Sequence, residues 1–244
     1  MEKPMTCIFI AGATGYTGSA FVKRLAQAKH DVVAHIRPDS PSMAEMAPLF
    51  KSHGARIDTS PWEPAAIADA LKASKATHVA SLLGTTRARA RKASKKGIDA
   101  TYEAVERDMT LMLLAAAQDM KEKPRFIFLS AMGADKSGGN RYMAARTMVE
   151  KAIFNSGLNY LIARPAFISG SDRSEFRLME RSATIISDGI LSMTGLMGAR
   201  KFRDSYRSLN AEQLAAGMAT LALREGNIIA NPFMLRHPDH SSHR

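Results

Sequence analysis

The feature that most constrains this chain is an apolar run near its start that ends in three regularly spaced glycines. Residues Thr6 to Ala11 are almost wholly apolar, and Gly12, Gly15 and Gly18 follow at intervals of three. Such a run predicts a buried strand, and the glycines predict a tight turn into a helix, because a backbone that turns sharply and passes close to a ligand has no room for Cβ atoms. The helix would direct its free N–H groups and the positive end of its dipole at an anion.

The context of the glycine turn favours binding of a dinucleotide. The following helix carries Phe21, Val22 and Leu25 on one face, and residues 31–36 form a second apolar, β-branched run that predicts a strand. The alternative is a tight turn with a packing role only. We therefore expect the turn to hold a pyrophosphate, with a contact set made of Gly12, Thr14, Gly15, Tyr16, Thr17 and Gly18.

The rest of the chain alternates predicted strands with predicted helices, which indicates an α/β fold with a doubly wound parallel sheet of the Rossmann type. Strands are expected at residues 55–58, 77–83, 125–130 and 160–164, and helices at 64–74, 98–120, 141–155 and 210–224. We expect a Rossmann domain over residues 1–170. Residues 171–244 would form a small substrate-side cap and a C-terminal helix packed on the same domain, followed by a polar, frayed tail.

Composition limits the partners of the chain. Its 244 residues carry a net charge of +11, which favours anionic partners such as nucleotides, acidic proteins, nucleic acid or a membrane surface. Six of the ten residues 87–96 are Arg or Lys, yet none is aromatic, so we expect a solvated loop beside an anionic ligand more than a nucleic-acid site. The single cysteine allows no disulfide or cysteine metal cluster within one chain. No apolar run long enough to span a membrane and no signal peptide is recognised, which predicts a cytoplasmic location.

Two strand ends bear on the choice of cofactor. Arg37 follows the second strand, where an arginine can bind the 2′-phosphate of NADP(H) and an acidic residue would favour NAD. The alternatives are a solvated arginine, or an acidic role for nearby Asp39. The fourth predicted strand ends at Gly84, Thr85 and Thr86, on the sheet edge where such folds bind ligands.

Ser130 and Tyr142 suggest chemistry at a carbonyl group. The serine ends a predicted strand and the tyrosine opens the next helix. A tyrosine hydroxyl can give or take a proton while a serine hydroxyl holds the substrate oxygen. Because the pKa of tyrosine is ordinarily about 10, the reaction needs a cation nearby, and Arg146 lies four residues later on the same helical face.

With these residues the chain resembles the atypical short-chain dehydrogenase/reductases, and in particular their Tat-interacting-protein oxidoreductase branch. The motifs that carry the resemblance lie between residues 5 and 170: Gly12-Ala-Thr-Gly-Tyr-Thr-Gly18, Leu83-Gly-Thr-Thr-Arg87, Leu129-Ser-Ala-Met-Gly-Ala-Asp-Lys-Ser137, Tyr142 and Arg164-Pro-Ala-Phe-Ile-Ser-Gly170. The resemblance implies an NADPH-binding domain with Gly12, Gly15, Gly18, Arg37 and the strand end Leu83, Gly84 and Thr85 around the cofactor. It also implies that Ser130 and Tyr142 lie near the nicotinamide. The family has a lysine at the position of Arg146, which binds the nicotinamide ribose; arginine keeps the charge and the forked donors but does not relay a proton.

Two functions follow from these expectations. The first is an NADPH-dependent oxidoreductase acting on a small carbonyl compound or alcohol, with Ser130, Tyr142 and Arg146 as catalytic residues. The second is a non-catalytic NADPH-binding regulator whose cofactor state alters a protein partner. The substrate and the oligomeric state are not readable from the sequence, because a fold does not determine them.

Overall fold

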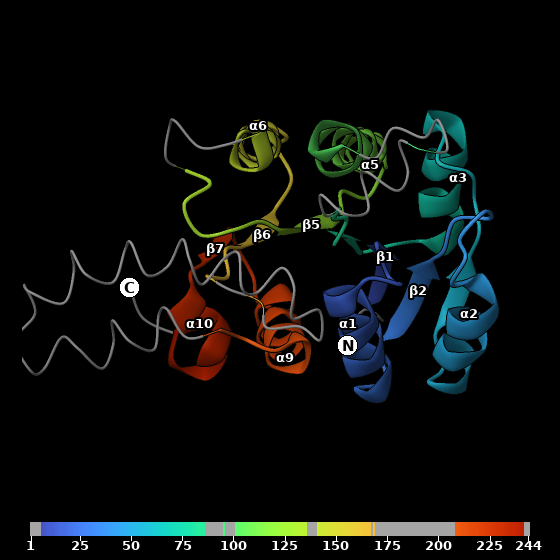
Figure 1. Cartoon of the computed structure of the whole chain (residues 1–244), viewed down its shortest axis with the longest axis horizontal. Helices are drawn as coiled ribbons and strands as arrows, with labels where there is room; N and C mark the ends of the chain where they lie inside the picture. Colours follow the sequence, from blue (N-terminus) through green and yellow to red (C-terminus); the bar gives the residue numbers. More distant parts are fainter. Residues whose placement is uncertain are drawn as a thin grey trace, which may run out of the picture.

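A parallel sheet with helices on both faces organises the chain (Figure 1). The computed structural model describes residues 6–85, 95, 101–135, 141–166, 168 and 208–241. Within these residues the sheet has seven strands in the order β3-β2-β1-β4-β5-β6-β7. The strands are β1 (Cys7–Ala11), β2 (Asp31–His35), β3 (Arg56–Asp58), β4 (His78–Ser81), β5 (Arg125–Leu129), β6 (Tyr160–Ala163) and β7 (Ile228–Ala230), and every neighbouring pair is parallel. The predicted doubly wound Rossmann sheet is confirmed.

Two helical layers cover the sheet (Figure 1). One layer holds α1 (Tyr16–Gln27), α2 (Met43–Ser52), α9 (Ala211–Ala222) and α10 (Pro232–Arg236), followed by the short helix η2 (Pro238–Ser241). The other holds α3 (Pro64–Ser74), η1 (Tyr102–Asp108), α5 (Met109–Gln118) and α6 (Arg141–Phe154). Alternate residues of β1 supply the two cores: Ile8 and Ile10 face the first layer, and Phe9 faces the second. Each large apolar side chain buried in this way stabilises the fold by roughly 1.5–3 kcal/mol.

The strand order reverses between β1 and β4, and this is the place where doubly wound sheets bind ligands. The chain runs from β1 outward to β2 and β3, and β4 then returns to the other side of β1. The two strand ends touch, because the Leu82 amide donates a hydrogen bond of 2.9 Å to the carbonyl of Ala11. The glycine turn after β1 and the loop after β4 therefore border the same crevice.

Two predictions about the elements are corrected by the structure. The helix expected over residues 98–120 is described from residue 101 as two segments, because η1 is π-helical and only α5 is α-helical. The tail expected to be frayed instead contains β7, which pairs with β6, and α10, which packs on α9. The packing is close: a Cβ on Gly217 of α9 would lie 2.0 Å from the carbonyl oxygen of Leu235. The C-terminal helix α9 packs on α1, as expected, whereas the predicted cap lies outside the described residues.

His78 opens β4 in a largely buried position that disfavours its charged form. It pairs in register with Arg125 of β5, and its Nδ1 lies 2.9 Å from the hydroxyl oxygen of Thr77. Burial lowers the pKa of His78 to about 4, and the charge of Arg125 acts in the same direction. The group therefore binds a proton more readily in the unfolded chain than in the native fold.

We expect this difference to make the protein less stable in mild acid. The free energy of unfolding should be unaffected by His78 above its ordinary pKa of 6.5, and should fall as the pH drops toward 4. The loss should amount to about 2–3 kcal/mol, and His78→Gln should remove most of it. Urea unfolding of both proteins at neutral, intermediate and acidic pH measures the difference. Equal losses in the two proteins would contradict the assignment, since His35, whose pKa burial also lowers, is unchanged in both.

Candidate functional site

The three glycines of the turn differ in how much room they leave for a side chain. Gly12 has a φ of +80°, and a Cβ on it would lie 2.5 Å from the carbonyl oxygen of Leu82; a Cβ on Gly18 would lie 2.1 Å from the carbonyl oxygen of Gly12. Both positions therefore have no room for a side chain. Gly15 is different, because its φ of −73° suits any residue and its Cβ would meet one atom within 4 Å, the carbonyl oxygen of Gly12 at 3.2 Å. The space in front of Gly15 is the approach to the start of α1.

The start of α1 has the properties of an anion site. Its first turn reads Tyr16-Thr-Gly-Ser19 and carries no acidic side chain, and Gly15 offers no side chain that could cap the helix. Thr17 is buried and Thr14 is half-buried beside the turn. Tyr16 is 49% exposed and lines an open cavity of about 340 Å³ together with Leu49 of α2. The predicted contact set is thus brought together around the turn, with the Tyr16 ring at its rim.

The loop after β2 presents a cation and an anion side by side. Arg37 Nη1 lies 3.6 Å from a carboxylate oxygen of Asp39, and both side chains are largely exposed. The structure therefore places both residues that bear on cofactor choice at the carboxyl end of β2. A solvated pair of this kind contributes little to stability, which leaves Arg37 able to exchange its partner for a phosphate.

The strand end after β4 is fixed by a carboxylate that the sequence did not single out. Glu106 of η1 is 1% exposed, and its Oε1 accepts a hydrogen bond of 3.1 Å from the Thr85 amide. Leu83 is half-buried and Gly84 is exposed in the same loop, with the site of a Gly84 Cβ 3.7 Å from that oxygen. Burial raises the pKa of Glu106, against the opposing effects of Arg146 and the Thr85 amide. The remaining residues of the Leu83–Arg87 motif lie outside the described part of the chain.

Tyr142 and Arg146 lie one turn apart on α6 and are in contact. The guanidinium carbon of Arg146 lies 4.5 Å from the centre of the Tyr142 ring, and the edge of the Tyr102 ring packs at 5.3 Å. Arg146 is 5% exposed, donates a hydrogen bond to the carbonyl of Leu129 at the end of β5, and places Nη2 2.9 Å from Glu106 Oε2. The predicted proximity of Tyr142 and Arg146 is observed, while the charge of Arg146 is held by Glu106.

Ser130 belongs to a second buried network. Its hydroxyl donates a hydrogen bond of 2.5 Å to Glu150, and Glu150 receives Nε and Nη2 of Arg164 at 3.0 and 2.5 Å. Arg164 also reaches Asp135 with Nη1 at 2.9 Å, and these bonds raise its pKa. Ser130 therefore lies at the end of β5, as expected, but its proton is directed at Glu150. In this arrangement its oxygen can accept a hydrogen bond from a ligand.

Glu106 and Glu150 are the site residues that the sequence analysis missed. Glu150 could have been found, because it continues the four-residue spacing of Tyr142 and Arg146 along one face of a helix. Glu106 gives no comparable signal, since its partners Thr85 and Arg146 are distant in sequence. Each glutamate meets an arginine from another element: Glu106 of η1 pairs with Arg146 of α6, and Glu150 of α6 pairs with Arg164 after β6.

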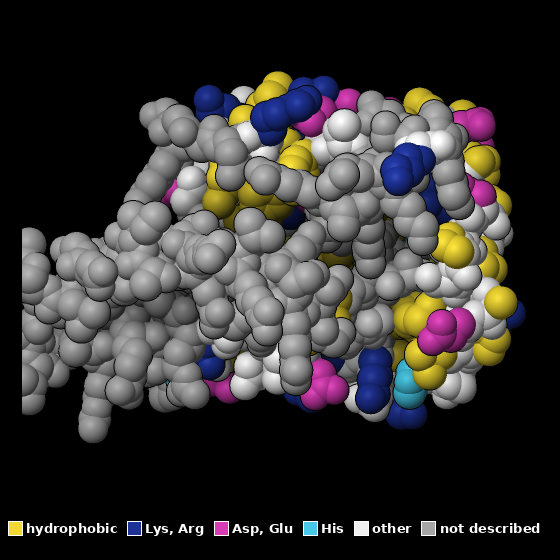
Figure 2. Space-filling model, in the orientation of Figure 1, with side chains coloured by type: hydrophobic (Ala, Val, Ile, Leu, Met, Phe, Trp, Pro, Cys, Tyr) yellow, Lys and Arg dark blue, Asp and Glu magenta, His cyan; other side chains and the backbone are white. Residues whose placement is uncertain are grey.

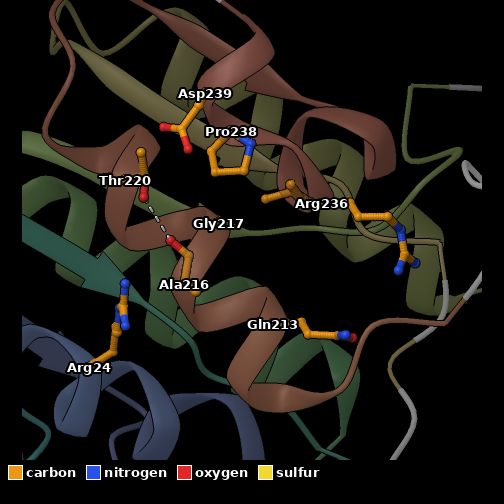
Figure 3. A pocket seen from close by; sticks show the side chains of 9 residues that line it. Arg24, Gln213, Ala216, Gly217, Thr220, Arg236, Pro238 and Asp239 are labelled. Atoms are coloured by element: carbon orange, nitrogen blue, oxygen red, sulfur yellow. Dashed lines mark hydrogen bonds between the residues drawn. The ribbon is translucent and has the colours of Figure 1, made fainter.

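A further cavity of about 280 Å³ lies away from the strand ends (Figure 3). Helices α1, α9 and α10 and the residues after α10 line it, among them Arg24, Thr220 and Arg236. The hydroxyl of Thr220 is turned back to the carbonyl of Ala216 of its own helix at 3.1 Å, and the Arg24 and Arg236 side chains do not converge in Figure 3. This cavity therefore has no arrangement of groups comparable to the crevice between β1 and β4.

The described residues give three more observations about partners. They hold no group of three or more His, Cys, Asp or Glu side chains placed to bind a metal ion. None of the helices in this part of the chain combines the length and apolar character of a membrane span. Where Figure 2 shows described side chains, Lys and Arg are interspersed with Asp, Glu and hydrophobic residues. The basic residues 87–96 lie outside the described part of the chain except Lys95.

Comparisons with known proteins show which family the chain belongs to. A family model for NAD(P)H-binding domains matches residues 12–191. The FMP52 protein of Coccidioides immitis (strain RS), which is named as mitochondrial, is 34% identical over 198 residues, covering 75% of this chain and 74% of that protein. The matched region contains the glycine turn, the loop after β4 and the Tyr142 helix.

Solved structures share the fold at low sequence identity. A proposed epimerase from Burkholderia cenocepacia J2315 has a TM-score of 0.63 at 20% identity, over 93% of this chain and 76% of that one. A proposed NAD-dependent epimerase/dehydratase from Bacillus halodurans has a TM-score of 0.62 at 16% identity, over 96% and 99%. Leucoanthocyanidin reductase from Vitis vinifera, solved with NADPH, has a TM-score of 0.52 at 19% identity, over 66% and 50%.

Sheet order, glycine turn and matched family model lead to the same assignment. The chain belongs to the NAD(P)H-binding family, as a Rossmann-fold protein related to the atypical short-chain dehydrogenases and to FMP52.

Proposed function

We propose that the protein is an NADPH-dependent oxidoreductase that acts on a small carbonyl compound or alcohol. The observation that carries the proposal is the setting of Tyr142 on the helix that follows β5, because its ring contacts both the Tyr102 ring and the Arg146 guanidinium. This helix begins at the same sheet edge as the glycine turn, so a cofactor on the turn would extend toward Tyr142. The cofactor would supply or take up a hydride at the substrate carbon.

The residues of the chain would then divide the remaining work. Gly12, Gly15, Gly18 and the start of α1 would bind the pyrophosphate, and Arg37 the 2′-phosphate. Tyr142 would exchange a proton with the substrate oxygen, favoured by the positive charge of Arg146 against the face of its ring. The Ser130 hydroxyl already donates its hydrogen bond to Glu150, so its oxygen would accept a hydrogen bond from a substrate hydroxyl.

A second function, the NADPH-binding regulator, is favoured by one specific observation. The groups that a tyrosine mechanism uses are engaged in internal bonds: Ser130 donates to Glu150, and Arg146 is paired with Glu106. A protein that binds the cofactor without turnover would tolerate such bonds, and its cofactor state would act on a protein partner through the loop after β4. Turnover of NADPH with a panel of carbonyl compounds, together with the Tyr142 variant below, separates the two functions.

The place of action stays a prediction. The sequence predicts the cytoplasm, whereas the name of the related FMP52 places that protein in mitochondria. Imaging of the full chain carrying a C-terminal fluorescent tag, against markers for both compartments, decides between them.

The first prediction concerns Gly15. Gly15→Val should still fold, with a small fall in thermal midpoint, because the position has ordinary backbone angles and its Cβ would meet the Gly12 carbonyl oxygen at 3.2 Å. It should lose NADPH affinity by more than about a hundredfold, because the side chain blocks the approach to α1. Gly18→Ala is the contrasting variant and should lower the thermal midpoint, since its Cβ meets backbone at 2.1 Å. Calorimetric titration and thermal unfolding measure both. Normal NADPH binding by Gly15→Val would remove the cofactor from this turn.

The second prediction concerns the choice of cofactor. Arg37→Ala should weaken NADPH binding by about 10- to 100-fold and leave NADH binding nearly unchanged, because the lost charge-assisted bonds serve the 2′-phosphate alone. Asp39→Asn is the matched variant, and it should not weaken NADPH binding, because it only frees Arg37 from its neighbour. Wild-type titrations that give equal affinities for the two cofactors would refute the role of Arg37, and a loss of NADH affinity in Asp39→Asn would assign the acidic role to Asp39.

The third prediction concerns Tyr142. Tyr142→Phe keeps the ring contacts but loses the proton donor, so kcat should fall by about a hundredfold or more while the dissociation constant for NADPH stays within about twofold. Tyr102→Phe serves as the control. It also removes one phenolic hydroxyl from the same pair of rings, and it should retain turnover. Stopped-flow measurement of NADPH oxidation supplies kcat. A Tyr142→Phe protein as active as wild type would exclude the tyrosine mechanism and favour the regulator.

A further inference from the structure

Two helices face each other at the site through pairs of side chains with matching spacing. Tyr102 and Glu106 of η1 lie four residues apart and contact Tyr142 and Arg146 of α6, which are also four apart. A third pair at the exposed end of this row joins Glu103 to Arg141 at 2.7 Å. The row therefore fixes the position of α6, and with it Tyr142, relative to η1.

Glu106 is the member of this row that also reaches the cofactor side of the site. Its Oε1 accepts from the Thr85 amide at 3.1 Å, and its Oε2 lies 2.9 Å from Arg146 Nη2. One side chain, 1% exposed, thus connects the loop after β4 to the helix of Tyr142. A carboxylate in such a place loses its hydration on folding, and a stable fold keeps it only when partners of this kind replace the water.

Pairing with Arg146 alone does not explain why Glu106 also accepts a hydrogen bond from the Thr85 amide. The charge of Arg146 needs a carboxylate, and one oxygen meets that need; the second oxygen is aimed at a backbone amide in the loop where Gly84 is exposed. The π-helical form of η1 is consistent with this, because π-helical turns are rare and occur frequently at functional sites.

We propose that Glu106 is a positioning residue that sets the loop Leu83–Thr85 for cofactor binding and couples it to the Tyr142 helix. The proposal rests on the proposed function, in which this loop borders the bound NADPH. Glu106 would hold the loop in its binding conformation before the cofactor arrives, so that less ordering opposes binding. It would act through Thr85 and Arg146 and would not itself touch the substrate.

The test compares two double variants that both remove the ion pair. In Glu106→Gln with Arg146→Met the two charges are gone, but the glutamine carbonyl can still accept from the Thr85 amide; in Glu106→Leu with Arg146→Met no acceptor remains. Both keep the buried volume, and replacement of a buried ion pair by apolar groups of similar size is tolerated. The ion pair is absent from both double variants, so its loss affects both equally. The comparison therefore reports on the hydrogen bond to the Thr85 amide.

We expect the leucine variant to be the weaker binder. Its Thr85 amide should exchange with solvent about tenfold faster than in the glutamine variant, and its dissociation constant for NADPH should be about three- to tenfold higher, which corresponds to one lost hydrogen bond. Amide exchange by NMR and calorimetric titration measure the two quantities. As a control, Asp31→Asn with Arg56→Met removes the ion pair of 2.7 Å at the start of β2 and should change neither.

Two results would overturn the proposal. Equal Thr85 exchange in the two double variants would show that Glu106 does not hold the loop, and equal NADPH affinity would show that holding it does not serve the cofactor. Failure of the proposed function is a separate result, since wild type itself would then show no NADPH binding or turnover while the exchange of Thr85 still reports on Glu106.

Discussion

The contact between the backbone after β1 and the backbone after β4 sets the geometry of the whole carboxyl edge. At Gly12 the two segments pass so closely that a Cβ would lie 2.5 Å from a carbonyl oxygen of the other segment. The strand order reverses at this point, and the crevice, the start of α1 and the Leu83–Thr85 loop all take their places from it. A larger residue at Gly12 would separate β1 from β4, and the cofactor site and the sheet would be damaged together.

Two buried arginine–glutamate pairs fix the other side of the crevice. The pair of Arg146 and Glu106 links α6 to η1, and the pair of Arg164 and Glu150 links the end of β6 to α6. Burying four charges is costly, and such pairs seldom add stability over apolar packing. Their value lies in specifying geometry, because each glutamate also holds one more group: the Thr85 amide in one case and the Ser130 hydroxyl in the other.

The sequence predicts the elements whose signals are local. The helices expected at residues 64–74 and 210–224 match α3 and α9, and the apolar side chains Leu214, Met218 and Leu221 of α9 are buried. The strand β7 was missed because it has three residues, and only its pairing with β6 makes it a strand. The π-helical turn of η1 was missed for a similar reason, since partners distant in sequence define it.

In the candidate site, too, the sequence predicts the features with local signals and misses the contacts between residues distant in sequence. Glycine spacing and the spacing of Tyr142 and Arg146 are local, so the sequence predicted the glycine turn and the contact between these two side chains. The partners of Arg146 and Ser130 come from other elements. The spacing along α6 marks Glu150 as a candidate, but no local pattern pairs it with Ser130 or points to Glu106. The structure therefore adds what the sequence could not predict: the Ser130 hydroxyl donates to Glu150, and Arg146 is paired with Glu106.

The shortness of β7 also has a consequence for how the molecule meets other copies of itself. In the described sheet the two outer strands, β3 and β7, have three residues each, and β3 carries the charged side chains of Arg56 and Asp58. Strands of this length expose few unpaired N–H and C=O groups, and charged side chains oppose the approach of another strand. The described edges of the sheet are therefore poor templates for the strand-to-strand pairing that begins aggregation.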